Sequence, residues 1–174
     1  MPTAELPNRR LFSPARTLFL ALIAAALTQM VWYYPRLPAR VASHFDAAGQ
    51  VNAFMPKDAF FVIQLVVLGI LSGMFLLVPA LIVRLPPGMI NVPNKDYWLA
   101  PERRAHTVHK LETFLVGFGN VMLLFLLLVF REAMHANLLP YPHLSNRIWV
   151  LLLMLVAWCI YWTVRLVRAF RLPD

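Results

Sequence analysis

Four long apolar runs set the strongest limit on how this chain can fold. They lie at about 17–34, 59–83, 111–130 and 148–164. Wound as helices, runs of this length cover most or all of the roughly 30 Å of hydrocarbon in a bilayer. The 174 residues are 60% hydrophobic, against roughly 45–50% apolar residues in soluble domains. The sequence therefore predicts an all-α integral membrane protein, a single four-helix domain over residues 1–174 with the lipid bilayer as its solvent.

Positive charge is distributed unevenly among the connections between these runs. Of the 16 Lys and Arg residues, eleven lie in the leader, the 84–110 connection and the tail, and five lie in the other two connections. Lys and Arg concentrate on the cytoplasmic side of membrane proteins. Both termini and residues 84–110 are therefore expected in the cytoplasm, and the loop 35–58 is expected to face outward. Because the cations flank apolar runs instead of gathering on one face, no nucleic-acid partner is expected.

The outward loop 35–58 has the pattern of a small β-hairpin. Two short segments, 41–45 and 50–54, flank a stretch in which Asp46 and Gly49 suit a turn. An isolated hairpin is only marginally stable in water, so it needs support from the ends of the spans. We expect Phe45 and Phe54 to supply that support by packing on the spans.

The cytoplasmic loop 84–110 is interrupted by prolines, which argues against one continuous helix. Tyr97 and Trp98 suit the level of the lipid headgroups. Pro101 suits the first position of a new helix, and no helix-breaking residue follows before about residue 136. The start of that helix is therefore expected to project beyond the hydrocarbon. Three of its cations are expected to attract anionic headgroups: Arg103, Arg104 and Lys110.

Two stretches of the chain carry a family resemblance. They read LPARVASHFDAAGQVNAFMPK, from Leu37, and INVPNKDYWLAPERR, from Ile90. Over about residues 21–104 the chain resembles the bacterial membrane domain of unknown function 1648, which is also similar to the front of the sporulation-delaying-toxin immunity proteins. The resemblance implies a multi-pass protein of the bacterial cytoplasmic (inner) membrane with an immunity-like character. The candidate interaction loop is Leu37, Pro38, His44, Phe45, Asp46 and Gly49, and the candidate cytoplasmic motif is Asn91, Pro93, Asn94, Lys95, Tyr97, Trp98 and Glu102.

Titratable residues near both ends of the spans offer weaker hypotheses. A metal or proton site can be imagined on the outward side, but loops in water carry such residues routinely. On the inner side, the titratable residues recur at helical spacing, which is more typical of the solvated face of a helix than of a metal site. No catalytic constellation is recognised, so neither an enzyme nor a metal or other cofactor is expected. The outward set is His44, Asp46, Glu132, His135 and His143, and the inner set is Glu102, His106, His109 and Glu112.

Three functions remain open at this point. The first is a membrane-embedded binding, sensing or immunity-type protein whose outward loop engages a peptide, an envelope component or a membrane-protein partner. The second is a small transporter or channel subunit, and the third is a metal-dependent membrane enzyme. Gly69 and Gly73 lie four residues apart, a spacing that lets helices approach closely and is compatible with a homo-oligomer.

Overall fold

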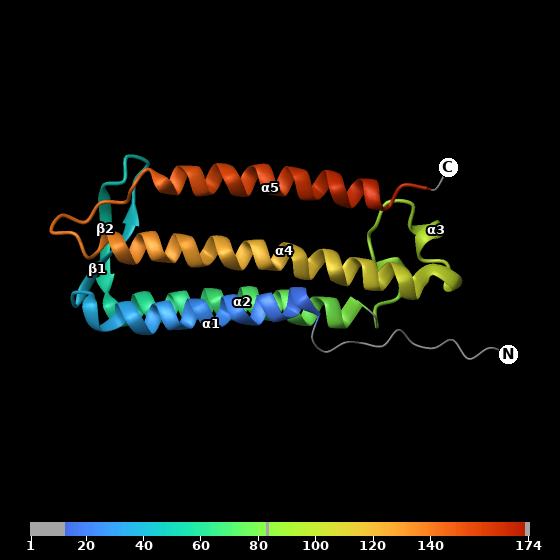
Figure 1. Ribbon diagram of the computed structural model, residues 1–174, viewed down its shortest axis with the longest axis horizontal. Coiled ribbons are helices and arrows are strands. Elements are labelled where there is room, and N and C mark those ends of the chain that lie inside the picture. Colours follow the sequence, from blue (N-terminus) through green and yellow to red (C-terminus); the bar gives the residue numbers. More distant parts are fainter. Residues whose placement is uncertain (1–12, 83, 173–174) are drawn as a thin grey trace.

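The computed structural model describes residues 13–82 and 84–172, and it contains four helices long and apolar enough to cross a membrane. They are α1 (Pro14–Tyr33), α2 (Lys57–Ile82), α4 (Pro101–Ala136) and α5 (Arg147–Ala169). The four run side by side along the longest axis of the molecule (Figure 1). This confirms the predicted fold of four apolar helices with a small hairpin between the first two. As expected from the sequence, α4 begins at Pro101 and continues without interruption to Ala136.

The central element of the bundle is α4, which packs against α1 and α2 on one side and against α5 on the other (Figure 1). One buried cluster joins the first three of these helices through Phe19, Leu68, Phe75 and Leu123. Large apolar side chains cover the outer surfaces of the helices, including some that are mostly exposed. Such a surface would be unfavourable in water and suits contact with lipid.

Gly119 allows close contact of α4 with α1 and α2. A Cβ atom at Gly119 would lie 2.7 Å from Phe75 Cγ and 2.9 Å from Phe19 Cε2, too close for any side chain. By contrast, a Cβ at Gly69 or Gly73 would meet no atom of the described residues within 4 Å outside its own stretch of helix. The two glycines that the sequence singled out on α2 therefore face open space. The close approach between helices inside the bundle occurs at Gly119.

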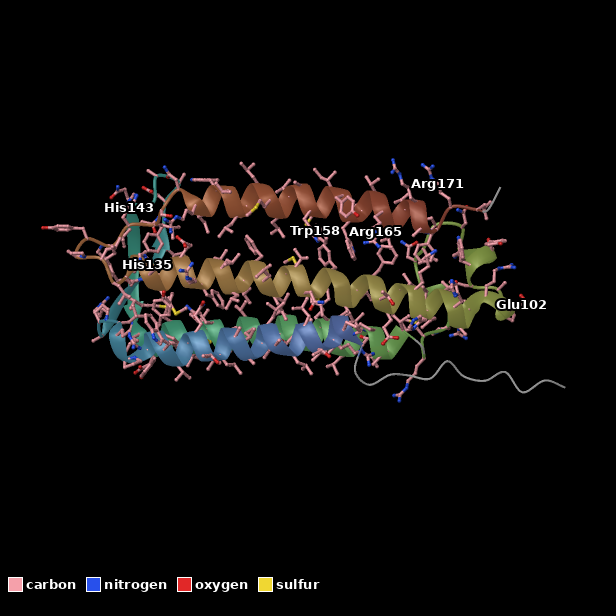
Figure 2. All side chains as sticks on the ribbon, viewed as in Figure 1. Glu102, His135, His143, Trp158, Arg165 and Arg171 are labelled. Atoms are coloured by element: carbon pink, nitrogen blue, oxygen red, sulfur yellow. The ribbon has the colours of Figure 1, made fainter. Side chains whose placement is uncertain are left out.

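The helix α5 contacts α4 through a row of aromatic rings and buries none of its own residues fully. Trp158 and Arg165 lie between α5 and α4 (Figure 2). The ring of Trp162 packs over Gly117, where an added Cβ would come within 3.0 Å of it. The guanidinium of Arg165 lies 5.5 Å from the centroid of Phe114, within the range of a cation–π contact.

The predicted hairpin is present at one end of the bundle. It consists of β1 (Arg40–Phe45) and β2 (Val51–Pro56), which pair antiparallel, and it follows the short helical turn η1 (Tyr34–Arg36). The expectation for Phe54 is wrong, because its side chain is 52% exposed. Alternation along β2 turns residues 52, 54 and 56 away from the spans.

The connection between α2 and α4 lies at the other end. Over residues 84–100, the part of it that the structure describes, it contains only the short turns η2 (Pro87–Met89) and α3 (Lys95–Trp98), as expected from its prolines. Asn94 has a left-handed backbone with a φ of 54° and directly precedes α3. The start of α1 and the end of α5 lie at this same end (Figure 1).

Candidate functional site

The hairpin is joined to α4 and to the linker 137–146, and we call this assembly the hairpin cap. Asn137, which follows the last residue of α4, is 4% exposed. Its Oδ1 accepts a hydrogen bond from the backbone N–H of Ala42 (2.6 Å), and its Nδ2 donates to the carbonyl of Ala42 (3.0 Å). One side-chain amide thus satisfies both backbone groups of Ala42, on the side of β1 away from β2, as a neighbouring strand would.

The linker also pairs with the hairpin turn. The backbone N–H of Leu144 donates to the carbonyl of Gly49 (3.0 Å), and Gln50 forms an isolated antiparallel bridge with His143. Gly49 has a φ of 79°, and a Cβ there would collide with the Leu144 carbonyl and lie 2.9 Å from the His143 ring. From the start of α5, Trp149 Nε1 donates to the carbonyl of Ala47 at 3.3 Å. The turn is therefore held by both the linker and α5.

Several residues of the candidate interaction loop build this cap. Leu37 is buried in a cluster with spans α1, α2 and α4. The Asp46 carboxylate accepts the backbone N–H groups of Ala48 (2.9 Å) and Gln50 (2.8 Å), which closes the turn. Because Asp46 lies in the turn, it does not share a strand face with His44. These contacts give Leu37, Asp46 and Gly49 structural roles that require no ligand.

The remaining residues of the loop are available at the surface. His44 is exposed, and its Nδ1 lies 3.3 Å from the hydroxyl of Ser43. Pro38 is exposed and Phe45 is half-buried. The exposed side chains of the two strands are Arg40, His44, Asn52, Phe54 and Pro56, of which residues 52, 54 and 56 alternate along β2.

The candidate cytoplasmic motif lies at the opposite end and holds the end of α5. Asn94 Nδ2 and Trp98 Nε1 both donate to the carbonyl of Phe170, each at 2.9 Å. Lys110 donates to the carbonyl of Ala169. The Phe170 ring is fully buried and packs edge-on against Trp98. The carbonyls that a helix leaves unpaired at its C-terminus are satisfied here by side chains.

All three cations expected to meet lipid headgroups bind the chain instead, since the two arginines make contacts of the same kind as Lys110. Arg103 Nε donates to the carbonyl of Tyr97 at 2.7 Å, and its guanidinium lies 3.9 Å from the centroid of that ring. Arg104 Nη2 donates to the carbonyl of Leu85 at 2.6 Å. These contacts fix α3 and the 84–100 connection against α4. Other members of the motif are exposed at the surface: Asn91, Pro93, Lys95 and Glu102.

The titratable residues singled out from the sequence do not assemble into a metal site. Within residues 13–82 and 84–172, no three His, Cys, Asp or Glu side chains come together in a geometry that could hold an ion. At the hairpin end, where Figure 2 labels His135 and His143, Glu132 Oε2 instead accepts the hydroxyl of Ser145 at 3.1 Å. At the other end Glu112 pairs with Arg16, which joins the start of α1 to α4.

Sequence reasoning missed the residues that connect distant segments, above all Asn137, Trp149 and Arg16. Asn137 carried one local signal, since a polar amide directly after a long helix is well placed to bind nearby backbone groups. The sequence did not indicate its partner, because Ala42 is an unremarkable strand residue 95 positions away.

The fold and the cap define a multi-pass helical membrane protein. Residues 19–70 match the family described as Domain of unknown function (DUF1648), so the chain contains this domain from α1 through the hairpin into α2. The match ends before Asn91, which places the cytoplasmic motif outside the matched residues. No curated protein and no solved structure matches the chain.

Proposed function

We propose that this chain is a membrane-embedded binding protein whose hairpin cap engages an extended peptide segment of a partner. The observation that carries the proposal is the asymmetry of the hairpin. Asn137 occupies the free edge of β1, whereas within the described residues the backbone of β2 pairs with β1 alone. An unpaired strand edge can accept an extended peptide by main-chain hydrogen bonds.

The side chains on β2 would add specificity to such pairing. Phe54 is half-exposed on this strand, and His44 and Asn52 are exposed on the same hairpin. Aromatic side chains are enriched among the residues that dominate binding energy. Because the hairpin is already held by α4, α5 and the linker, less conformational entropy is lost when a partner binds.

The test is photo-crosslinking of the full chain in its native membrane, with adducts identified by mass spectrometry. A photoreactive residue at position 52 is expected to capture one defined polypeptide. The matched control places the same group at Val66, an exposed residue on α2. Capture of the same species from both positions, or of none from position 52, would contradict the proposal.

The proposed location is the bacterial cytoplasmic (inner) membrane, with both termini cytoplasmic and the cap outside. The excess of Lys and Arg at the end of the bundle opposite the hairpin supports this orientation. A membrane-impermeant thiol reagent is expected to label a cysteine at Ala48 in intact cells and not one at Gly88, with Cys159 replaced in both. The reverse pattern would contradict the orientation.

A second copy of the chain is a further proposed partner, bound through α2. The open space at Gly69 and Gly73 would let the backbones of two α2 helices approach. A Cβ added at Gly69 meets no described atom within 4 Å outside its own stretch of helix, so Gly69→Leu starts in open space and tests this contact. The yield of crosslinked dimer in membranes is expected to fall with Gly69→Leu and to persist with Gly88→Leu. Equal yields from the two variants would argue against self-association through α2.

An alternative function is a small transporter or channel subunit, which a buried polar group on α2 favours. Gln64 is 2% exposed, and neither its Oε1 nor its Nε2 has a hydrogen-bond partner. An unsatisfied amide among apolar helices is costly, and polar groups inside the membrane often line a path. Solute flux in liposomes that Gln64→Leu abolishes would support this alternative, and absence of flux would count against it. We propose no enzymatic activity.

A further inference from the structure

We propose that the chain binds an anionic phospholipid in a groove beside the cap, with the lipid phosphate at Arg131. The groove lies between α1 and the end of α4 that reaches the hairpin, and its volume is about 510 Å³. The groove is open along most of its surface instead of enclosed. The lining is Ala25, Thr28, Gln29, Trp32, Tyr33 and Arg131.

Arg131 supplies the cation for this site. Within residues 13–82 and 84–172, its exposed guanidinium has neither a hydrogen bond nor an ion pair with another side chain or carbonyl. The adjacent carboxylate of Glu132 accepts a hydrogen bond from Ser145 instead. A charged side chain near the end of a membrane span is unfavourable unless it reaches water or an anionic group. A lipid phosphate at the bilayer surface provides that group.

The other lining residues give the groove the character of a lipid site. Gln29 Nε2 donates to the carbonyl of Leu127 at 3.1 Å, which ties α1 to α4 along the groove. Thr28 is exposed and offers a hydroxyl donor, and Ala25 adds a small apolar side chain to the lining. Trp32 is a side chain suited to the interface between headgroups and hydrocarbon.

Charge favours an anionic headgroup over a zwitterionic one. The groove lining contains no carboxylate that would receive the ammonium of a zwitterionic lipid. A second cation lies close by, because the guanidinium of Arg36 stacks 3.9 Å from the centroid of the Trp32 ring. A lipid such as phosphatidylglycerol, with a phosphate and no ammonium group, therefore complements the site best.

The experiment is native mass spectrometry of the purified full chain, titrated with phosphatidylglycerol or with phosphatidylcholine. Wild type is expected to retain phosphatidylglycerol preferentially, and Arg131→Gln is expected to weaken that retention about tenfold because charge-assisted hydrogen bonds are lost. Arg131→Lys keeps the cation and is expected to restore most of the binding. Arg168→Gln removes an exposed cation at the other end of the bundle and serves as the matched control.

A second variant, which keeps Arg131, ensures that the test does not depend on whether Arg131→Gln folds. Thr28→Trp fills the groove at an exposed position and is expected to reduce phosphatidylglycerol binding while the helical circular dichroism stays unchanged. The proposal is overturned if both lipids bind wild type equally, if Thr28→Trp retains full binding, or if Arg168→Gln weakens binding as much as Arg131→Gln.

Discussion

Asn137 binds the backbone of Ala42 with both ends of its side-chain amide, although the two residues lie 95 positions apart in the chain. The contact covers the free edge of β1 at Ala42, whereas the outer edge of β2 (Val51–Pro56) is unpaired within the described residues. It also means that the hairpin is a fixed part of the helical bundle. The surface at which we propose that a partner binds is therefore carried by a supported element, which favours precise recognition.

Removing the Asn137 amide should destabilise the cap. Asn137→Ala leaves the buried N–H and carbonyl of Ala42 without partners, at a cost of about 2–4 kcal/mol in the free energy of unfolding. The measurement is thermal unfolding of the purified protein in detergent. Asn146→Ala is the control, because the Asn146 side chain makes no capping hydrogen bond to α5. Equal midpoints for the two variants would contradict the structural role of Asn137.

Gly49 should resist substitution for two separate reasons. Its φ of 79° is unfavourable for any residue with a Cβ, at a cost of about 1–2 kcal/mol, and the added atom would also collide with the linker. We expect Gly49→Ala to lower the unfolding midpoint and to speed hydrogen exchange in the hairpin. Gly88→Ala should have little effect, because a Cβ there meets nothing within 4 Å. If hydrogen exchange in the hairpin stays the same in Gly49→Ala, the contact between Gly49 and the linker does not stabilise the hairpin.

The two kinds of helical glycine should respond differently to alanine. At Gly119 the added methyl group overpacks the contact with Phe19 and Phe75, which typically costs about 1–3 kcal/mol. At Gly69 it enters open space, so the effect on the monomer should stay within about 0.5 kcal/mol. Unfolding of both variants in the same detergent tests this contrast. Equal destabilisation would mean that α4 does not approach its neighbours through Gly119.

The candidate cytoplasmic motif should control the end of α5. Trp98→Phe keeps an aromatic ring but loses the indole donor to the Phe170 carbonyl, so amide exchange over residues 166–172 should accelerate several-fold. Hydrogen–deuterium exchange with mass spectrometry provides the measurement. Tyr97→Phe is the control, because it keeps the ring that contacts Trp98 and Arg103. Unchanged exchange in Trp98→Phe would show that the carbonyl is held by other groups.

The sequence predicted those features that depend on neighbouring residues. Runs of apolar residues specify the spans, Asp46 and Gly49 specify the turn, and Pro101 specifies the start of α4. Each follows from local chemistry that acts within a few positions of the chain.

Features that depend on the assembled bundle could not be predicted in this way. Whether Phe54 packs on the spans or faces outward depends on which face of the hairpin the linker and α4 cover. Likewise, Arg103 and Arg104 have the sequence signature of headgroup-binding cations, yet carbonyls of Tyr97 and Leu85 lie within their reach. Side chains that bind distant backbone carry no periodic signal, because almost any residue can be the acceptor.

The measurement that tests the central claim most directly is the yield of the adduct captured from position 52 when Phe54 is replaced. If the exposed face of the hairpin binds a partner, Phe54→Ala should reduce that adduct about tenfold or more, as expected for loss of an aromatic binding residue. Val66→Ala, on the lipid-facing side of α2, should leave the yield unchanged. An adduct that persists undiminished in Phe54→Ala, with the cap intact by hydrogen exchange, would contradict a binding role for the hairpin face.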